Sequence, residues 1–181
     1  MNDELILLER ARALDQEALG LIHDTYYQSI QRYISFRIND AATVEDLTSE
    51  VFVRFLAALR DRHAPRNTLR GWLFGVASRV IKEQYRQQQR AQIVPLDEAM
   101  PTTTPTPEQQ AGQALANARL HRALGRLTDE QQNVLALRFG AEMPIKEVAQ
   151  MMDKSVGAVK MLQARALAML TEQLRGLEAN S

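Results

Sequence analysis

The chain has 181 residues, 45% of them hydrophobic, which is enough for the core of one domain or of two small ones. Basic and acidic residues both number 22, and this balance argues against a protein that coats nucleic acid nonspecifically. The absence of cysteine excludes disulfides, thiolate nucleophiles and cysteine zinc sites. Three scattered histidines, His23, His63 and His121, do not form a metal cage on their own, so we expect no metal and no cofactor.

The longest apolar run near the start of the chain extends only from Leu5 to Leu8, between Glu4 and Glu9. This run is too short for the apolar region of a secretory signal or for a membrane span. We therefore expect a cytoplasmic protein with no membrane insertion.

Charge is distributed unevenly along the chain. Residues 1–59 carry five arginines against ten acidic residues, a balance of −5. Residues 60–92 carry eight basic residues against Asp61 and Glu83, a balance of +6. An acidic part followed by a basic part indicates two surfaces with different partners.

Helical periodicity dominates the first 60 residues. The spacing predicts helix from Leu5 to Ile38, in two pieces, ended by Asn39 and Asp40. Thr43 is a suitable N-cap for the next helix, where Glu45 and Asp46 in the first turn would favour the helix dipole. The positions expected to be buried are Leu19, Ile22, Tyr26, Ile30, Tyr33, Ile34, Val44, Leu47, Val51, Phe55 and Leu59.

Two acidic residues, Asp46 and Glu50, lie four positions apart on this second helix. Such a like-charge pair costs about a few tenths of a kcal/mol. Two explanations remain open. Arg54, four residues beyond Glu50, can offset the repulsion on a solvated face, or the pair can form a docking surface for a basic partner.

The segment from Arg60 to Asn67 has no periodicity, so we expect a loop, followed by a third helix capped by Thr68. A basic stripe follows on this helix at offsets of 3, 7 and 11 residues and consists of Arg79, Lys82, Arg86 and Arg90. Basic stripes are usually solvated surfaces. This one has few acidic neighbours, however, and each phosphate neutralised would add about 0.9 to the salt slope of DNA binding. We interpret the stripe as a nucleic-acid contact. On this third helix, the positions expected to face the core are Leu69, Trp72, Leu73, Val76, Ala77 and Val80.

A proline-rich stretch divides the chain. Between Ala91 and Gln110 it contains four prolines and three successive threonines, a composition that resists helix and strand. We predict a flexible linker over residues 93–113, which separates a domain at 1–92 from a domain at 114–181.

The helical pattern resumes from Ala114. Thr128 and Gln131 have the spacing of a capping box, which opens a helix that ends at Gly140. Two further short patterns follow. Pro144 suits the first position of a helix with an apolar face, and Ser155 suits the N-cap of the next helix. The apolar positions are Ile145, Val148, Ala149 and Met152 in the first of these helices and Val156, Val159, Leu162, Ala166 and Leu170 in the second.

Two helices that meet at such a turn are typical of a helix-turn-helix. The second helix can lie in the major groove, with the Ser155 hydroxyl and the free amides of the first turn facing phosphate. Lys160, Gln163 and Arg165 are then expected on the side opposite the core. A helical hairpin with no DNA-binding role would show the same pattern.

Three stretches in this order resemble the sigma-70 family of bacterial sigma factors, in its compact extracytoplasmic-function group. They are Glu45 to Phe52, Gly71-Trp72-Leu73 through Arg86, and Leu127-Thr128 through Ala166, within a resemblance from about Glu17 to Leu174. The resemblance implies an all-α fold with a region 2-like domain and a region 4-like helix-turn-helix domain joined by a flexible linker. It also implies core RNA polymerase and promoter DNA as partners, an anti-sigma factor as a possible further partner, and no enzymatic activity.

The resemblance assigns roles to individual residues. The loop from Asp61 to Thr68 becomes the pocket for a flipped base of the nontemplate strand, and the basic stripe holds phosphates. The implied polymerase contacts are Glu45, Asp46, Ser49 and Glu50. The implied contacts to the −10 element are Arg62, His63, Arg66, Asn67, Trp72, Arg79, Lys82, Arg86 and Arg90. The implied contacts to the −35 element, in the helix-turn-helix 144–166, are Lys154, Ser155, Gly157, Ala158, Lys160, Gln163 and Arg165.

Some positions depart from the family pattern. Arg79 stands where the family often has Asn, and Glu83 where it often has Asp. In the turn of the helix-turn-helix, Asp153 replaces a common Gly, which is tolerable because Asp can adopt the left-handed region. Lys154 replaces an apolar residue and can reach phosphate.

The sequence therefore predicts a two-domain transcription initiation factor. The main alternative is a conventional helix-turn-helix regulator, which binds operator DNA tightly without replacing sigma. A small hydrolase is a weaker third hypothesis, because no Ser, His and carboxylate grouping and no glycine-rich phosphate loop stand out.

Overall fold

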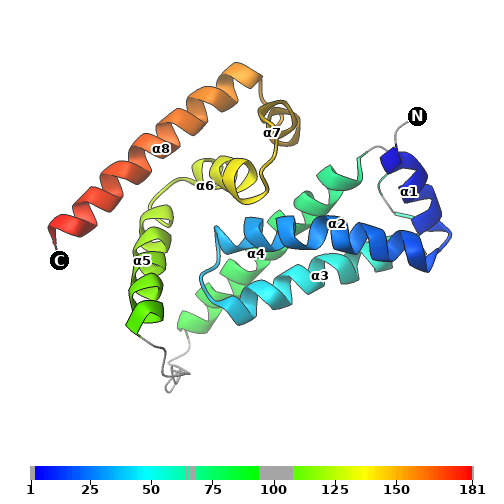
Figure 1. Cartoon of the computed structure of the whole chain (residues 1–181), viewed down its shortest axis with the longest axis horizontal. Coiled ribbons are helices and arrows are strands. Elements are labelled where there is room, and N and C mark those ends of the chain that lie inside the picture. The colour runs from blue at the N-terminus through cyan, green and yellow to red at the C-terminus, as the bar shows by residue number, and fades with distance from the viewer. Residues whose placement is uncertain (1–2, 64, 66–67, 94–107, 181) are drawn as a thin grey trace.

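The computed structural model describes residues 3–63, 65, 68–93 and 108–180, without the side chains of 92–93 and 108–110. Throughout these residues the regular elements are helices, as the sequence predicted (Figure 1). They are α1 (Asp3–Arg12), α2 (Gln16–Ser35), α3 (Ala41–Arg60), α4 (Leu69–Ile93), α5 (Glu108–Leu124), α6 (Asp129–Leu135), the π-helical turn η1 (Ala136–Gly140), α7 (Ile145–Met152) and α8 (Val156–Ala179).

Helices α2, α3 and α4 pack side by side, and α1 packs at one end of them (Figure 1). The apolar stripes predicted from spacing face inward. Leu19, Tyr26, Leu47 and Trp72 are half-buried, and every other predicted core position in this half is buried. Since helices gain most of their stability from such packing, the bundle explains why all three form.

The prediction that Thr43 caps α3 was wrong. The N-cap is Asp40, whose carboxylate accepts hydrogen bonds from the Thr43 backbone N–H at 2.9 Å and from the Thr43 hydroxyl at 2.6 Å. The hydrogen bond from this hydroxyl is the main reason why the pKa of Asp40 lies below its usual value. The helix therefore starts earlier than predicted, and Glu45 and Asp46 lie beyond its first turn.

The second half begins earlier than expected as well. Helix α5 starts at Glu108, so residues 108–113, predicted as linker, are helical. The proline run ends at position 107, and the Glu, Gln and Ala residues that follow are good helix formers.

The predicted capping box is confirmed, since the Gln131 N–H donates to the Thr128 hydroxyl at 3.2 Å and the Gln131 side chain accepts from the Thr128 N–H at 3.1 Å.

The predicted helix-turn-helix is confirmed as α7 and α8. Pro144 lies one position earlier than expected, as the N-cap of α7. Asp153 in the turn adopts the left-handed conformation, with φ 52° and ψ 48°. The Ser155 hydroxyl caps α8 by accepting a hydrogen bond from the Ala158 N–H at 3.1 Å.

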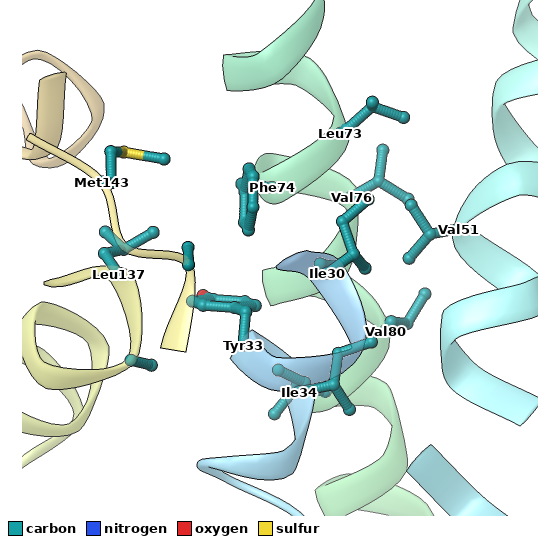
Figure 2. Close-up of a cluster of buried hydrophobic side chains, with 14 of the residues drawn as sticks. Ile30, Tyr33, Ile34, Val51, Leu73, Phe74, Val76, Val80, Leu137 and Met143 are labelled. Atoms are coloured by element: carbon teal, nitrogen blue, oxygen red, sulfur yellow. The ribbon is translucent and has the colours of Figure 1, made fainter. Parts of the chain in front are cut away.

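The first half of the chain, α1 to α4, and the second half, α5 to α8, share a continuous apolar core. Leu137 of η1 and Met143 face Phe74 of α4 and Tyr33 of α2 (Figure 2), and all four side chains are at most 1% exposed. The rings of Tyr33 and Phe74 meet edge to face, with their centroids 5.4 Å apart. Apolar contact of this kind holds η1 against α2.

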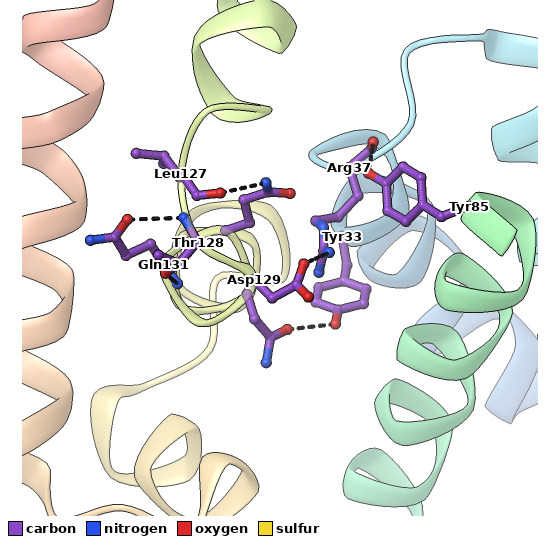
Figure 3. A network of polar contacts seen from close by, with 9 residues as sticks. Tyr33, Arg37, Tyr85, Leu127, Thr128, Asp129 and Gln131 are labelled. Atoms are coloured by element: carbon purple, nitrogen blue, oxygen red, sulfur yellow. Dashed lines mark hydrogen bonds and ion pairs between the residues drawn. The ribbon is translucent and has the colours of Figure 1, made fainter. Parts of the chain in front are cut away.

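Polar contacts join the same surfaces (Figure 3). The Tyr33 hydroxyl donates to the Asn133 side-chain oxygen at 2.6 Å. Arg37, whose side chain is only 4% exposed, donates to Asp129 at 2.9 Å and lies against the Tyr85 ring. The Tyr85 hydroxyl donates to the Arg37 carbonyl oxygen at 2.5 Å.

Gly140 lies where the backbone of η1 comes closest to α2. A Cβ atom at this position would be 3.1 Å from the Arg32 carbonyl oxygen, 3.2 Å from Tyr33 Cα and 3.0 Å from Phe36 Cδ2. Its φ is not positive, so the glycine is required by the close approach and not by its conformational freedom. The helix-ending role predicted for Gly140 is therefore secondary to this contact.

We expect Gly140→Ala to weaken the packing between the two halves by about 1 to 3 kcal/mol, because two of the crowded neighbours are backbone atoms that cannot rotate away. The chain has no cysteine, so dyes on Gln28→Cys and Glu172→Cys would report the separation of the halves by energy transfer. Gly176→Ala, which meets no atom within 4 Å, is the control. An unchanged separation in Gly140→Ala would contradict the role of this contact.

Candidate functional site

One side of α3 carries the acidic residues predicted to bind polymerase. Glu45, Asp46 and Ser49 are exposed, and Glu50 is half-buried. Val53, seven positions after Asp46 and 58% exposed, continues the same side. Single exposed apolar residues are common on protein surfaces, so Val53 extends this side of α3 but does not by itself identify a binding surface. We missed Val53 in the sequence, although its position outside the buried stripe was a usable signal.

Glu50 is paired within the chain. Arg54 Nε donates to Glu50 Oε1 at 2.8 Å, and the two Nη atoms donate to the carboxylate of Glu83 on α4 at 2.6 and 3.1 Å. Of the two explanations for the like-charge pair, neutralisation by Arg54 therefore holds for Glu50. Asp46, by contrast, remains exposed. The hydrogen bonds from Arg54 are also the main cause of the lowered pKa of Glu83.

The basic stripe lies on the exposed side of α4. All four of its members, Arg79, Lys82, Arg86 and Arg90, are exposed. Trp72 is half-buried, and its ring lies 5.6 Å from the Phe55 ring, so one part of the indole packs on the core and another part reaches solvent. Because Arg54 holds the Glu83 carboxylate, the only acid within this stretch of α4 is directed toward α3.

Residues before α4 were predicted to form a pocket for a flipped base. Arg62 and His63 are exposed, and Arg62 has a left-handed backbone with φ 58°. Pro65 is buried, and its carbonyl oxygen accepts a hydrogen bond from Arg12. Arg66 and Asn67 lie outside the described residues.

The helix-turn-helix presents a smaller polar surface than predicted. Ser155, Lys160 and Arg165 are exposed, as are Gly157 and Ala158. Gln163, expected on the side opposite the core, is half-buried, and its side-chain oxygen accepts a hydrogen bond from Arg138 of η1 at 3.1 Å. Lys154 is half-buried and paired with Glu130 at 3.0 Å, so it is not directed freely into solvent.

The first turn of α4 and the first turn of α7 are joined. Arg70 donates to Glu147 at 2.9 Å across the contact between the two halves. The ends of the two elements predicted to read DNA therefore touch each other in this structure. Helix α3 packs against α1, α2 and α4, and Asp46, Ser49 and Val53 on its outer side stay open to solvent.

The described part of the chain holds no cluster of three or more His, Cys, Asp or Glu side chains arranged to bind a metal ion. In the same residues, we find no helix with the length and apolar character needed to cross a lipid bilayer.

Two family profiles match the chain, described as "Sigma-70 region 2" over residues 22–91 and "Sigma-70, region 4" over residues 123–172. The chain is 32% identical to the extracytoplasmic-function (ECF) RNA polymerase sigma factor ShbA of Streptomyces griseus, over 91% of each protein. It is 33% identical to the ECF sigma factor BldN of Streptomyces coelicolor, over 93% of this chain and 64% of BldN.

Solved structures agree with these matches. The structure of CnrH in complex with the cytosolic domain of CnrY superposes with a TM-score of 0.69 at 26% identity, over 99% of this chain and 100% of that one. The curated CnrH sequence is from Cupriavidus metallidurans. The chain therefore belongs to the ECF RNA polymerase sigma factors of the sigma-70 family, which direct transcription initiation.

Proposed function

We propose that the acidic side of α3 binds core RNA polymerase and that this chain thereby brings the enzyme to a promoter. In this proposal α4 and the residues before it act on the −10 element, and α7 with α8 acts on the −35 element. The observation that carries it is the segregation of surfaces. Exposed Asp46, Ser49 and Val53 form an acidic and apolar side of α3, while the exposed cations lie on α4.

We assign no catalytic role to this chain, and we place its action in the cytoplasm, where polymerase works. Polymerase docking and −10 recognition belong to domain 1–92, and −35 recognition belongs to the domain that α5 opens. The two halves match different sigma regions, and this favours a sigma factor over a conventional helix-turn-helix regulator.

Melting of the −10 element needs no ATP in this scheme. Stacking or enclosing an unpaired base contributes roughly 1 to 3 kcal/mol, and the four cations of α4 add phosphate contacts along the separated strand. Half-buried Trp72 at the start of α4 offers a ring on which a base can stack.

Promoter binding requires the two halves to move apart. The −10 and −35 elements are separated by about 25 base pairs, or about 85 Å of duplex at 3.4 Å per base pair. Helix α4 is about 37 Å long at 1.5 Å per residue, and its first turn is tied to α7 by Arg70 and Glu147. We infer that core polymerase binds the chain in a form in which the contact through Tyr33, Arg37 and Gly140 is broken.

We also propose an anti-sigma factor as a partner. CnrH, a relative at 26% identity over the whole chain, has been solved with the cytosolic domain of CnrY. A partner that keeps α2 and η1 in contact would hold this chain away from polymerase.

We expect Asp46→Lys with Glu50→Lys to lower the affinity for core polymerase at least about tenfold, since like charges placed across an interface cost several kcal/mol. Fluorescence anisotropy of the labelled chain titrated with core enzyme would measure this. Glu172→Lys with Glu178→Lys, on exposed positions of α8, makes the same change in net charge and is the control. Equal affinities for the two variants would remove α3 from the docking surface.

We expect Lys160→Ala with Arg165→Ala to weaken protection of the −35 element. Removing one side chain that neutralises a phosphate reduces the salt slope of holoenzyme binding by about 0.9, so the slope of the double variant should fall by about 2. DNase footprinting at several salt concentrations would show this. Arg175→Ala, near the end of the same helix, is the control, and an unaltered footprint and slope in the double variant would exclude both residues.

A further inference from the structure

Helix α1 precedes the two segments that match sigma regions. It nevertheless contacts Pro65 and the first two residues of α4. Glu4 Oε1 accepts hydrogen bonds from the backbone N–H groups of Leu69 at 2.8 Å and Arg70 at 3.1 Å. Arg12 donates through Nη2 to the Pro65 carbonyl oxygen at 2.5 Å. One helix thus holds the start of α4 with its first turn and the preceding residues with its last turn.

Helix α1 is itself firmly attached to the bundle. Leu8 and Ala11 are at most 1% exposed. Arg10 donates to Asp15, the N-cap of α2, at 2.7 Å and to Glu17 at 2.8 Å. The contacts made by Glu4 and Arg12 are therefore fixed relative to α2 and do not come from a freely moving terminus.

The contact of Glu4 has a clear physical role. The first N–H groups of a helix have no partner within the helix, and the N-terminal end carries partial positive charge. The Glu4 carboxylate supplies both an acceptor and a negative charge there. It orders the turn that leads to Trp72, whose own N–H makes a long hydrogen bond of 3.3 Å to the Thr68 carbonyl oxygen.

We propose that α1 positions the start of α4 for promoter melting, with Glu4 and Arg12 as positioning residues that do not touch DNA themselves. The inference rests on the proposed role of α4 at the −10 element. Glu4 keeps the first turn of α4 formed, and Arg12 keeps Pro65 at a fixed distance from it. The edge of Trp72 that reaches solvent is then held ready to receive an unpaired base.

The test uses the full chain with core polymerase on a promoter identified by run-off transcription of fragmented genomic DNA. Permanganate reactivity of −10 thymines measures the rate of opening. Removal of a helix-capping interaction changes an equilibrium roughly 5- to 30-fold, so we expect Glu4→Ala to slow opening by roughly that factor. Arg12→Ala removes a hydrogen bond from a charged donor, and we expect it to slow opening by a similar factor. Glu4→Gln, which retains a neutral acceptor, should recover part of the rate.

A second template separates positioning from general damage to the fold. On the same promoter with mismatched, already open −10 strands, we expect transcription by the variants to return to within about twofold of the unsubstituted chain, and their affinity for core polymerase to be unchanged. Glu9→Ala, on an exposed position of α1, should behave as the unsubstituted chain on both templates.

Two results would overturn the assignment of α1. One is opening at the unsubstituted rate in Glu4→Ala and Arg12→Ala. The other is an equal loss of transcription on duplex and open templates, which would reduce α1 to a stabilising element. If the unsubstituted chain itself produces no reactive thymines with polymerase, the proposed function of α4 fails, and this inference fails with it.

Discussion

Helix α2 packs against α3 and α4 in its own half of the chain and also contacts α6 and η1 in the other half. This double contact is the constraint on which the rest of the structure depends. Tyr33 packs its ring on Phe74 and donates its hydroxyl to Asn133. Burial raises the pKa of Tyr33, so the hydroxyl stays protonated and remains a donor. Arg37 is buried beside it, and a buried charge without a partner is strongly unfavourable, so Asp129 and the Tyr85 ring are needed where they lie.

This arrangement links stability to function. The contact buries Phe74, Leu137 and Met143, so separation of the halves exposes apolar surface and leaves Arg37 without Asp129. In the open form proposed above, contacts with polymerase and promoter would offset both costs. A chain held closed by its own core has little tendency to bind promoter DNA before it has bound polymerase, and this fits a factor whose DNA-reading parts are used only within a larger enzyme.

Local signals in the sequence predicted most of the fold. The capping box at Thr128, the left-handed Asp153 and the Ser155 cap each depend on residues within four positions, so spacing alone identifies them. The error at Thr43 arose because Asp40, three residues earlier, is a better cap, and the choice also depends on where the preceding chain leaves α2.

The parts that sequence reasoning missed depend on contacts between distant residues. Tyr33 and Asn133 are 100 positions apart, and Glu4 is 65 positions from Leu69. Gln163 was expected on the outer side of α8, but its orientation is determined by Arg138 on another element. Periodicity shows which side of a helix is apolar, but it does not identify the partner that covers that side.

The π-helical turn between α6 and α7 has a consequence for how α7 and α8 are aimed. Its hydrogen bond from the Ala141 N–H to the Ala136 carbonyl oxygen encloses one residue more than an α-helical bond does. One residue of α-helix corresponds to a rotation of about 100°. Without the additional residue, Gly140 would turn away from α2, and a residue with a side chain would meet the Arg32 carbonyl oxygen instead. The extra residue therefore determines how α7 and α8 are rotated relative to the bundle of α2, α3 and α4.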